Sequence, residues 1–224
     1  MDQSPVTTPP FLARYRQSFE STWTDDTPIE AVRFVVLDTE TTGLNPQTDR
    51  IVTIGAVAVQ NGEIVLDDAY SALLELERNT EAVTVHGVTR DESRGGLAEA
   101  EALAGFLDYL HDGVIVGHHI GHDVATFDAG YGRHWNMSLA NRNLDTMDLT
   151  LHLERDGAFA GRPPIRRFTL DSLCAMFDII PHDRHTAAGD AFITAQVFLR
   201  LLRLSSKHGR GTLGRICELF PVDA

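Results

Sequence analysis

The pattern of hydrophobic residues predicts a strand-rich region early in the chain and mostly helices later. Val32–Thr39 is an apolar run rich in valine, and Ile51–Gln60 is a second one, so both are predicted to be buried strands. Asn61-Gly62 is a pair that favours a tight hairpin turn, and Glu63–Leu74 is therefore expected to return as a third strand. Together these segments predict an antiparallel meander.

The rest of the pattern alternates helices with short strands. Apolar residues recur at helical spacing from Leu97 to His111, and the buried run Val114–Gly117 is predicted to be a strand followed by a helix through about Arg133. Asn143–Met147 is predicted as one more short strand. The remaining segments are a loop over Arg155–Arg167 and helices over Leu170–Phe177 and roughly Ala187–Leu204. This order predicts an α/β fold in which a mixed five-stranded sheet is covered by helices.

The ends of the chain are expected to lie outside the main domain. Pro9-Pro10 favours a short helix through Phe19, and the polar stretch at 24–28 is typical of a linker. We therefore expect an appendage over 1–30, a domain over 31–205 and a tail over 206–224. No apolar run is long enough to cross a membrane and no secretory signal is recognisable, so a cytoplasmic protein is expected.

Composition narrows the possible chemistry. The chain has 43% hydrophobic residues, enough for a sizeable core, and a formal net charge of −13. That charge counts against a protein that coats nucleic acid, but not against an enzyme that holds cations in a group of carboxylates. Cys174 and Cys217 are too few for a disulfide scaffold or a cysteine-based zinc module.

Two acids end the first predicted strand. Asp38 and Glu40 are two residues apart in LDTETTGL, so their side chains are expected on the same side of the sheet. Adjacent carboxylates repel each other unless they are protonated or bridged by a cation. Taken alone, however, the pair fits a solvated strand end equally well.

Three further residues become interesting only in combination. Asp123 follows the strand Val114–Gly117 and is expected at the same end of the sheet, although a helix dipole also favours an acid there. His185 and Asp190 in DRHTAAGDAF are five apart, a poor helical match. They converge more easily if His185 lies in the loop before the helix and Asp190 faces inward. A loop histidine and an exposed helix acid are the simpler interpretations.

The run HHIGHD at 118–123 raises the question of a transition-metal site. His118 and His122 are four apart, which on one helix would place both rings on the same face, as in many zinc sites. The run alone does not decide whether the histidines or only Asp123 carry the chemistry.

Taken together, the segments DTETTG (38–43), HHIGHD (118–123) and HTAAGD (185–190) resemble the DEDDh, or DnaQ-like, 3′–5′ exonucleases. This family includes the proofreading subunit of bacterial DNA polymerase III. TVHGVT (84–89), LDTMDL (144–149) and FTLDSLCAMFDI (168–179) add smaller similarities, and the resemblance covers about Val32 to Leu204. It implies a ribonuclease H-like sheet with the active site at one end.

The resemblance also implies a set of metal-binding acids and a general base: Asp38, Glu40, Asp123 and Asp190, with His185. Carboxylates suit Mg²⁺ or Mn²⁺, and two such ions roughly 3.5–4 Å apart can activate a water and stabilise the leaving oxygen. We expect Asp38 to bridge both ions and Glu40 and Asp190 to hold the ion beside the attacking water. Asp123 would act on the leaving-group side. His185 would take the proton from the water, because imidazole exchanges protons near neutral pH.

The implied substrate is the 3′ end of a single-stranded or frayed nucleic acid, from which nucleoside monophosphates are released. The implied contacts are the segment after the first motif, with Leu44 against a base, and the histidine of HGVT: Thr41, Thr42, Gly43, Leu44 and His86. Arg162, Arg166 and Arg167 are more simply interpreted as solvated loop residues than as phosphate contacts. DNA is favoured over RNA, while association with a polymerase or with a second copy is left open.

The second motif departs from the family pattern, which is close to HN-x-x-FD. His119 stands where asparagine is usual, and His122 where an aromatic residue is usual. We expect both side chains to lie behind the metal ligands or beside the terminal nucleotide rather than to bind metal.

Two other classes of function remain open. A catalytically silent binding module of the same fold should have lost some of the acids, yet all four and the histidine are present. An HD-type metallophosphohydrolase is suggested by His122-Asp123, but it needs further histidines and an all-helical chain, which the valine-rich strands oppose.

Overall fold

Five strands form one mixed sheet in the order β3-β2-β1-β4-β5. The computed structural model describes residues 8–76, 82–161 and 167–218, without the side chains of Val85 and His86. The strands are β1 (Phe34–Thr41), β2 (Ile51–Gln60), β3 (Glu63–Leu73), β4 (Val114–Gly117) and β5 (Asn143–Asp145). β1, β2 and β3 pair antiparallel, whereas β4 and β5 run parallel to β1. The predicted mixed five-stranded sheet is confirmed.

The hairpin between β2 and β3 has the geometry predicted for Asn61-Gly62. Both residues have positive φ, 54° and 74°, as a two-residue turn of the type I′ class requires. β1 begins two residues later than expected, at Phe34, and continues past Thr39 because Thr41 still pairs with Ile51. The acidic end of β1 is therefore part of the sheet rather than of a loop.

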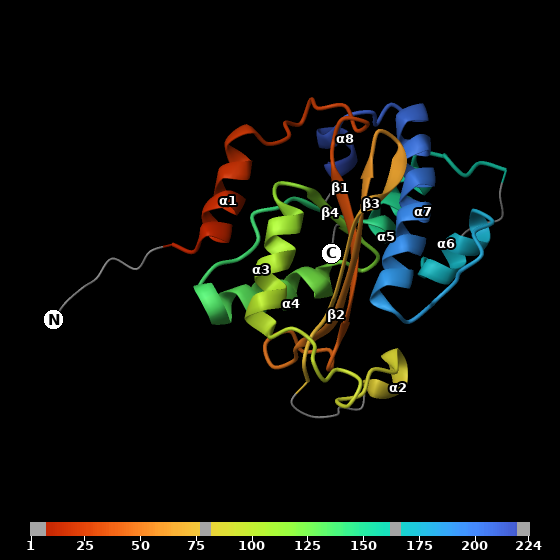
Figure 1. The fold of residues 1–224 in the computed structure, drawn as a ribbon. Helices are drawn as coiled ribbons and strands as arrows, with labels where there is room; N and C mark the ends of the chain where they lie inside the picture. Colours follow the sequence, from red (N-terminus) through yellow and green to blue (C-terminus); the bar gives the residue numbers. More distant parts are fainter. Residues whose placement is uncertain (1–7, 77–81, 162–166, 219–224) are drawn as a thin grey trace.

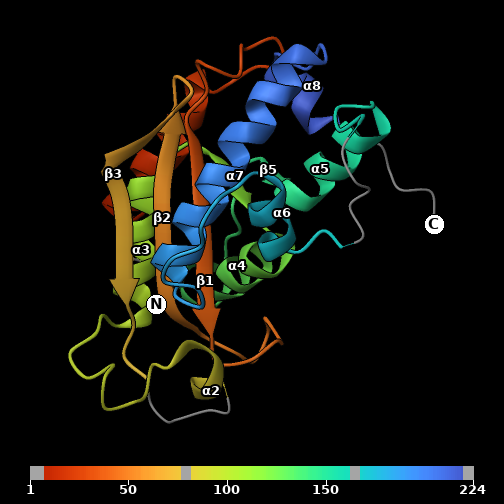
Figure 2. The ribbon, with the colours of Figure 1, turned by 90° about the vertical axis from the view of Figure 1, so that its right-hand side faces the viewer.

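Helices cover both faces of the sheet (Figures 1 and 2). One face carries α1 (Pro10–Ser18), α3 (Glu99–Leu110) and α4 (Gly121–Trp135); the other carries α5 (Thr146–Arg155), α6 (Leu170–Met176), α7 (Ala187–Lys207) and α8 (Leu213–Cys217). Short helical turns, η1 (Phe19–Ser21) and α2 (Val83–His86), lie in connections. Within the described residues, no helix is both long enough and apolar enough to span a membrane.

β1 separates two hydrophobic cores. Phe34 and Val36 pack with the α7 side of the molecule, and Val35 and Leu37 pack with the α3 side. All four side chains are at most 1% exposed. This alternation decides to which side each later residue of the strand points.

Besides the short turns η1 and α2, two helices, α5 and α8, were not anticipated from the pattern. The strand expected over Asn143–Met147 ends at Asp145, because the Asp145 carboxylate accepts a hydrogen bond from Met147 N and starts α5. α8 follows α7, and its Leu213 and Ile216 are fully buried.

The helix expected after Pro9-Pro10 is confirmed as α1, whose Leu12 and Tyr15 are buried in the α3-side core. The expected limits of the main domain stay a prediction.

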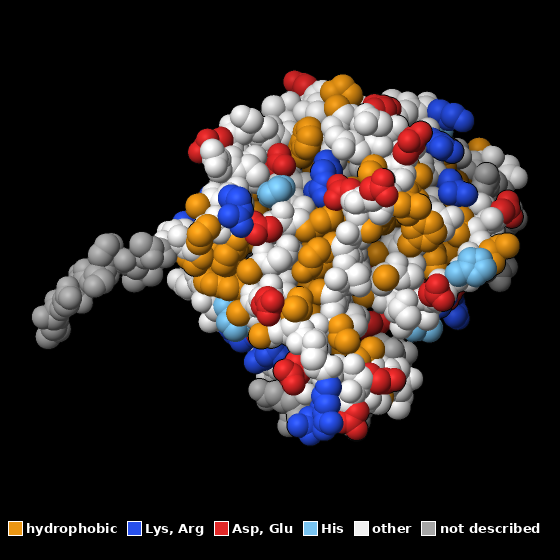
Figure 3. All heavy atoms as spheres, viewed as in Figure 1, with side chains coloured by type: hydrophobic (Ala, Val, Ile, Leu, Met, Phe, Trp, Pro, Cys, Tyr) orange, Lys and Arg blue, Asp and Glu red, His pale blue; other side chains and the backbone are white. Residues whose placement is uncertain are grey.

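The outer strand β3 leaves part of the sheet uncovered. Figure 3 shows hydrophobic side chains along the middle of the face that carries β3, between α3 and α7. The large exposed hydrophobic residues on these elements are Leu66 of β3 and Phe192 of α7, at 66% and 40%. Edge strands have a neighbour on one side only, which accounts for this exposure.

Candidate active site

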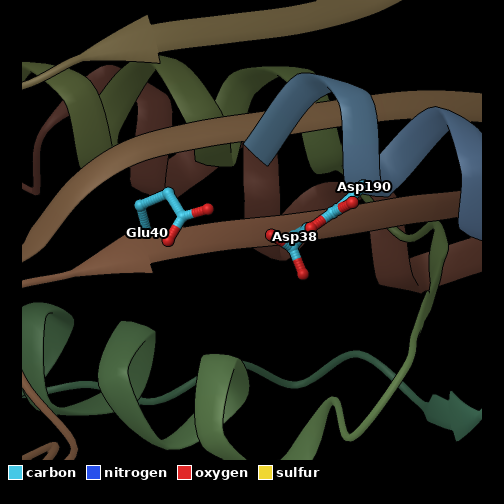
Figure 4. A group of neighbouring side chains, drawn as sticks. All are labelled: Asp38, Glu40 and Asp190. Carbon is cyan, nitrogen blue, oxygen red and sulfur yellow. The ribbon is translucent and has the colours of Figure 1, made fainter. Parts of the chain in front are cut away.

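Three carboxylates meet between the end of β1 and the start of α7. Ligand oxygens of Asp38, Glu40 and Asp190 all lie within 4.8 Å of one another. Figure 4 shows Asp38 and Glu40 along the same strand and Asp190 on α7, with Asp38 and Asp190 turned toward each other. The expectation that Asp38 and Glu40 share one side of the sheet is confirmed, as is the inward orientation of Asp190, which is 7% exposed.

A glycine allows α7 to come this close to the sheet. Gly55 of β2 pairs with Asp38 of β1. A Cβ atom at Gly55 would lie 2.3 Å from the backbone C of Ala187 and the backbone N of Ala188. Any side chain at this position would push the first turn of α7 outward and carry Asp190 away from Asp38.

The turn before α7 is packed as closely. Thr186 caps the helix by accepting a hydrogen bond from Gly189 N, and its hydroxyl donates to the carbonyl of Asp183. A Cβ atom at Gly189 would lie 2.1 Å from that same carbonyl oxygen. The glycine of HTAAGD therefore lets residues 183–186 fold back onto the start of α7.

The fourth acid approaches from the opposite face. Asp123 lies in the first turn of α4 and is 7% exposed. Its Oδ1 accepts hydrogen bonds from the backbone N and the hydroxyl of Thr39, at 3.0 and 2.6 Å. Asp123 is not one of the three residues whose oxygens lie within 4.8 Å, but its charge acts on Asp38. The structure thus places it beside the cluster rather than inside it.

Burial raises the pKa values of Asp38, Glu40 and Asp123, and neighbouring acids add to the rise at Asp38 and Glu40. Burial, followed by the charges of Asp123 and Asp190, raises the pKa of Asp38 well above its usual range. Burial and the same two neighbours raise the pKa of Glu40 to about 7. Burial raises the pKa of Asp123 to about 6, although the Thr39 hydrogen bonds act in the opposite direction. Such a group of acids is stabilised by divalent cations, and an all-oxygen donor set suits Mg²⁺ or Mn²⁺.

An arginine that the sequence analysis overlooked lies against the cluster. Arg184 forms an ion pair with Asp190 through Nη1 and a second one with Asp171 through Nε, at 2.9 Å. Its charge lowers the pKa of Asp38 and Glu40, opposing burial. The available signal was its position, directly before His185 and the third motif.

His185 lies in the turn before α7, as expected. Its φ is +63°, and its backbone N donates to Oδ2 of Asp190 at 3.2 Å. The residue is exposed, and within the described ranges its ring makes no hydrogen bond. The structure therefore places a free imidazole next to the cluster without fixing its direction.

The histidines of HHIGHD do not form one site. α4 begins at Gly121, so His118 precedes the helix and does not share a helix face with His122. Nδ1 of His118 lies 2.9 Å from the hydroxyl of Thr146, which itself donates to the carbonyl of Gly117. Burial, and then the charge of His119, lowers the pKa of His118 to about 4. Among the described residues, the one group of ligands close enough to share an ion contains only carboxylates.

The backbone explains the unusual His119. Its φ is +61°, and its N–H donates to Asp145 at 3.2 Å, while the next N–H, of Ile120, donates to the same carboxylate. Asparagine and histidine are both enriched among residues in this left-handed conformation. The side chain of His119 is exposed, whereas Nε2 of His122 is buried without a hydrogen-bond partner among the described residues.

The residues after the first motif form a hydrogen-bonded turn. The Thr41 hydroxyl donates to the carbonyl of Gly43, and the Thr42 hydroxyl donates to Asp49 at 2.9 Å. A Cβ atom at Gly43 would lie 2.6 Å from the Asp49 carboxylate, so this glycine lets the turn close. Leu44 follows and is 89% exposed. The turn holds Leu44 out in solvent, free to contact a ligand.

A groove of about 770 Å³ runs beside this turn. Residues of the turn, the segment after β3 and the start of α3 line it: Thr42, Thr48, Asp49, Arg50, Ile51, Leu74, Glu75, Leu76, Arg90, Ala98 and Glu99. His86, a predicted contact, lies in α2 with its side chain outside the described part. Of the loop arginines interpreted as solvated, Arg162 and Arg166 are outside the described residues and Arg167 is exposed.

Comparison with known proteins gives a consistent result. Residues 35–198 match the Exonuclease family of the RNase T type. The chain is 35% identical over 204 residues to a DNA polymerase III PolC-type protein of Thermotoga maritima, covering 87% of this chain and 14% of that protein. It is 35% identical over 196 residues to a DNA polymerase III subunit epsilon-like protein of Rhodobacter capsulatus, covering 85% of this chain and 27% of that protein.

The fold has a counterpart among solved structures. The crystal structure of E. coli exonuclease I in complex with a dT13 oligonucleotide superposes with a TM-score of 0.68 at 18% identity. The match covers 79% of this chain and 42% of that one. At this identity the comparison bears on the fold, and it agrees with the ribonuclease H-like sheet expected from the motifs.

Proposed function

Because this chain belongs to the DnaQ-like exonuclease family, matching it over residues 35–198, we propose that it is a metal-dependent 3′–5′ exonuclease. It would hydrolyse the phosphodiester bond at the 3′ end of a single-stranded or frayed nucleic acid and release nucleoside monophosphates. The observation that carries the proposal is the meeting of Asp38, Glu40 and Asp190 within 4.8 Å. Asp123 lies beside them, held by Thr39.

The carboxylates suit two divalent cations, Mg²⁺ or Mn²⁺. When bound, such ions supply Lewis-acid activation of water and balance the charge that develops on the phosphoryl and leaving oxygens. Asp38 would be the central ligand, because it lies among the other acids and its charge interacts with each of them. Glu40 and Asp190 would hold the ion on the side of the attacking water, and Asp123 would serve the leaving-group side.

His185 is the proposed general base. It precedes α7 directly, and its backbone is tied to Asp190, one of the proposed ligands. The exposed ring is free to turn toward an attacking water and take its proton. Gly189 and Thr186 fix the turn that carries His185, so its backbone is held next to Asp190.

The substrate end would meet the turn after β1. Leu44 is exposed and able to pack against a base, and Thr41, Thr42 and Gly43 present backbone groups to the terminal nucleotide. The neighbouring groove, which Thr42 also lines, would hold the following nucleotides. DNA is favoured over RNA because relatives are named as DNA polymerase III proteins and the superposed exonuclease I binds dT13. A cytoplasmic setting and association with a polymerase are part of the same proposal.

A time course with 5′-labelled strands tests the proposal. Matched DNA and RNA oligonucleotides, single-stranded and duplex, are incubated with Mg²⁺, with Mn²⁺ or with EDTA. The expected result is a ladder that shortens one nucleotide at a time from the 3′ end, fastest on single-stranded DNA and absent with EDTA.

D38A should abolish both the ladder and metal binding, whereas H185A should keep metal binding and slow the ladder. Binding of the strand without any product would instead favour a silent binding module.

A further inference from the structure

A guanidinium group is built into the wall of the carboxylate cluster. Arg184 donates from Nη1 to Oδ1 of Asp190 and from Nε to Oδ1 of Asp171, the latter at 2.9 Å. The Arg184 side chain is 23% exposed and that of Asp190 is 10% exposed. The proposed mechanism assigns no task to this arginine.

We infer that Arg184 is a positioning residue that orients Asp190 and lowers the affinity of the cluster for metal. The inference rests on the exonuclease function proposed above. It predicts an unusual combination for a variant that lacks the charge: tighter metal binding together with slower turnover.

Asp190 is held in one orientation. Both of its oxygens are held, Oδ1 by Arg184 and Oδ2 by the backbone N of His185 at 3.2 Å. A carboxylate has about four acceptor positions. Each oxygen therefore keeps a lone pair for a cation while the plane of the carboxylate is fixed. Loss of Arg184 would leave Asp190 free to rotate about its side-chain torsions.

Arg184 also changes the local charge at the cluster. Its guanidinium lies between Asp190, which belongs to the cluster, and Asp171, which does not, so it adds a positive charge at the edge of the site. A phosphodiester carries a single negative charge, which this guanidinium attracts. The same guanidinium repels the ions, since Arg184 and a cation would share the Asp190 carboxylate at close range. The arginine thus favours substrate over tight retention of metal.

Arg184 is itself held in place by a second carboxylate, that of Asp171. Asp171 lies in the first turn of α6 and is 67% exposed, and its pair with Nε fixes the guanidinium plane. A guanidinium can serve two carboxylates at once through separate edges of its fork, whereas an ammonium group acts as a point charge. Lysine at this position should therefore keep the charge effect and lose part of the orientation.

The test compares R184Q and R184K with the wild type. The dissociation constant for Mn²⁺ is measured by isothermal titration calorimetry without substrate, and kcat and KM are measured on single-stranded DNA. For R184Q we expect Mn²⁺ to bind about tenfold more tightly, because a cation next to the site is gone. We expect kcat to fall at least about tenfold and KM to rise. R184K should bind Mn²⁺ within about twofold of the wild type and have an intermediate kcat.

R210Q is the matched control. Arg210 also forms an ion pair with an aspartate, Asp156, at 2.7 Å, and its side chain is 14% exposed, but it lies near α8 and away from the cluster. Its loss should lower the melting temperature while leaving Mn²⁺ affinity and kcat within about twofold of the wild type.

Unchanged or weaker Mn²⁺ binding in R184Q would overturn the inference, as would an equal effect in R210Q. Because the calorimetric readout needs no turnover, it still decides the role of Arg184 if the wild type proves to have no nuclease activity. That second outcome would overturn the proposed function and not the inferred effect on metal affinity.

Discussion

The hydroxyl of Thr39 donates a hydrogen bond of 2.6 Å to Oδ1 of Asp123, and the Thr39 backbone N donates to the same oxygen at 3.0 Å. Thr39 lies between Asp38 and Glu40 on β1, so its side chain points to the opposite face of the sheet. The residue between two ligands thus positions the fourth acid.

Replacing Thr39 by valine should remove the side-chain hydrogen bond with little change in shape. We expect kcat in T39V to fall about tenfold, because Asp123 loses a bond that holds it and its pKa rises further. T39S keeps the hydroxyl and should retain most of the activity. Steady-state kinetics at saturating Mg²⁺ would measure both variants. Equal kcat values for T39V and the wild type would show that the backbone bond alone is sufficient.

Metal binding should depend on pH because the acids must lose their protons. Burial and neighbouring acids raise the pKa of Glu40 to about 7, and burial raises that of Asp123 to about 6. Protons compete with metal below these values. The Mn²⁺ dissociation constant should therefore fall at least about tenfold between pH 6 and pH 8. Calorimetry in buffers of different ionisation enthalpy should detect proton release, and a flat profile would contradict the raised pKa values.

The metal-free protein should show the opposite dependence in its stability. The pKa of Glu40 is raised from 4.5 to about 7, so protonation of this residue stabilises the fold fully below about pH 4.5. That contribution is lost as the pH rises through about 7. The melting temperature in EDTA should decrease from pH 5 to pH 8, and added Mn²⁺ should restore it at pH 8. In E40Q the decrease should be smaller, and an unchanged slope would exclude Glu40 as its source.

Gly55 should tolerate no side chain. In G55A the new Cβ would lie 2.3 Å from backbone atoms of Ala187 and Ala188, which cannot rotate away. We expect a loss of about 3 kcal/mol in the free energy of unfolding and weaker Mn²⁺ binding. The matched control is G132A on α4, where the nearest atom to a new Cβ is 4.0 Å away; there helix propensity predicts a gain of about 0.5–1 kcal/mol. Urea denaturation measures both, and a G55A protein of wild-type stability would contradict the close approach.

His122 should be replaceable by phenylalanine. Its Nε2 is buried and has no hydrogen-bond partner among the described residues, so an apolar ring relieves the cost of an unsatisfied polar atom. H122F should be more stable than the wild type by about 1 kcal/mol and should keep its Mg²⁺-dependent activity within about twofold. Thermal unfolding and the oligonucleotide assay provide the measurements. Activity that is lost in H122F and depends on zinc in the wild type would revive a histidine metal site.

The parts of the site that follow from short-range pattern could be predicted from the sequence. Asp38 and Glu40 share a face because side chains alternate along a strand. For Asp190 the local pattern favoured an exposed helix acid, and only the resemblance of the three motifs together predicted its place in the site. Gly55 lies within an apolar run and carries no local signal. A glycine is needed there only because α7, far away in the sequence, packs against it. Arg184 was equally unpredictable, because its meaning depends on the position of Asp171 on another helix.

The missed helix α5 shows a different limitation. Asp145 is the last residue of the short strand β5, and its side chain also caps α5. The same carboxylate accepts hydrogen bonds from the backbone N–H groups of His119 and Ile120. A local pattern cannot decide between these tasks, because the partners come from two segments about 25 residues apart. The capping carboxylate ends the strand earlier than its apolar residues suggest.

The alternation of β1 has a mechanical consequence. The side chains of Asp38 and Glu40 point to the α7 side of the strand, whereas Asp123 lies on α4 and is hydrogen-bonded to Thr39 on the other side. Bound cations would therefore clamp two separately packed layers across a single strand. Loosening of either layer should release metal before the whole chain unfolds, and saturation with metal should protect amide protons in both α4 and α7 from exchange with solvent.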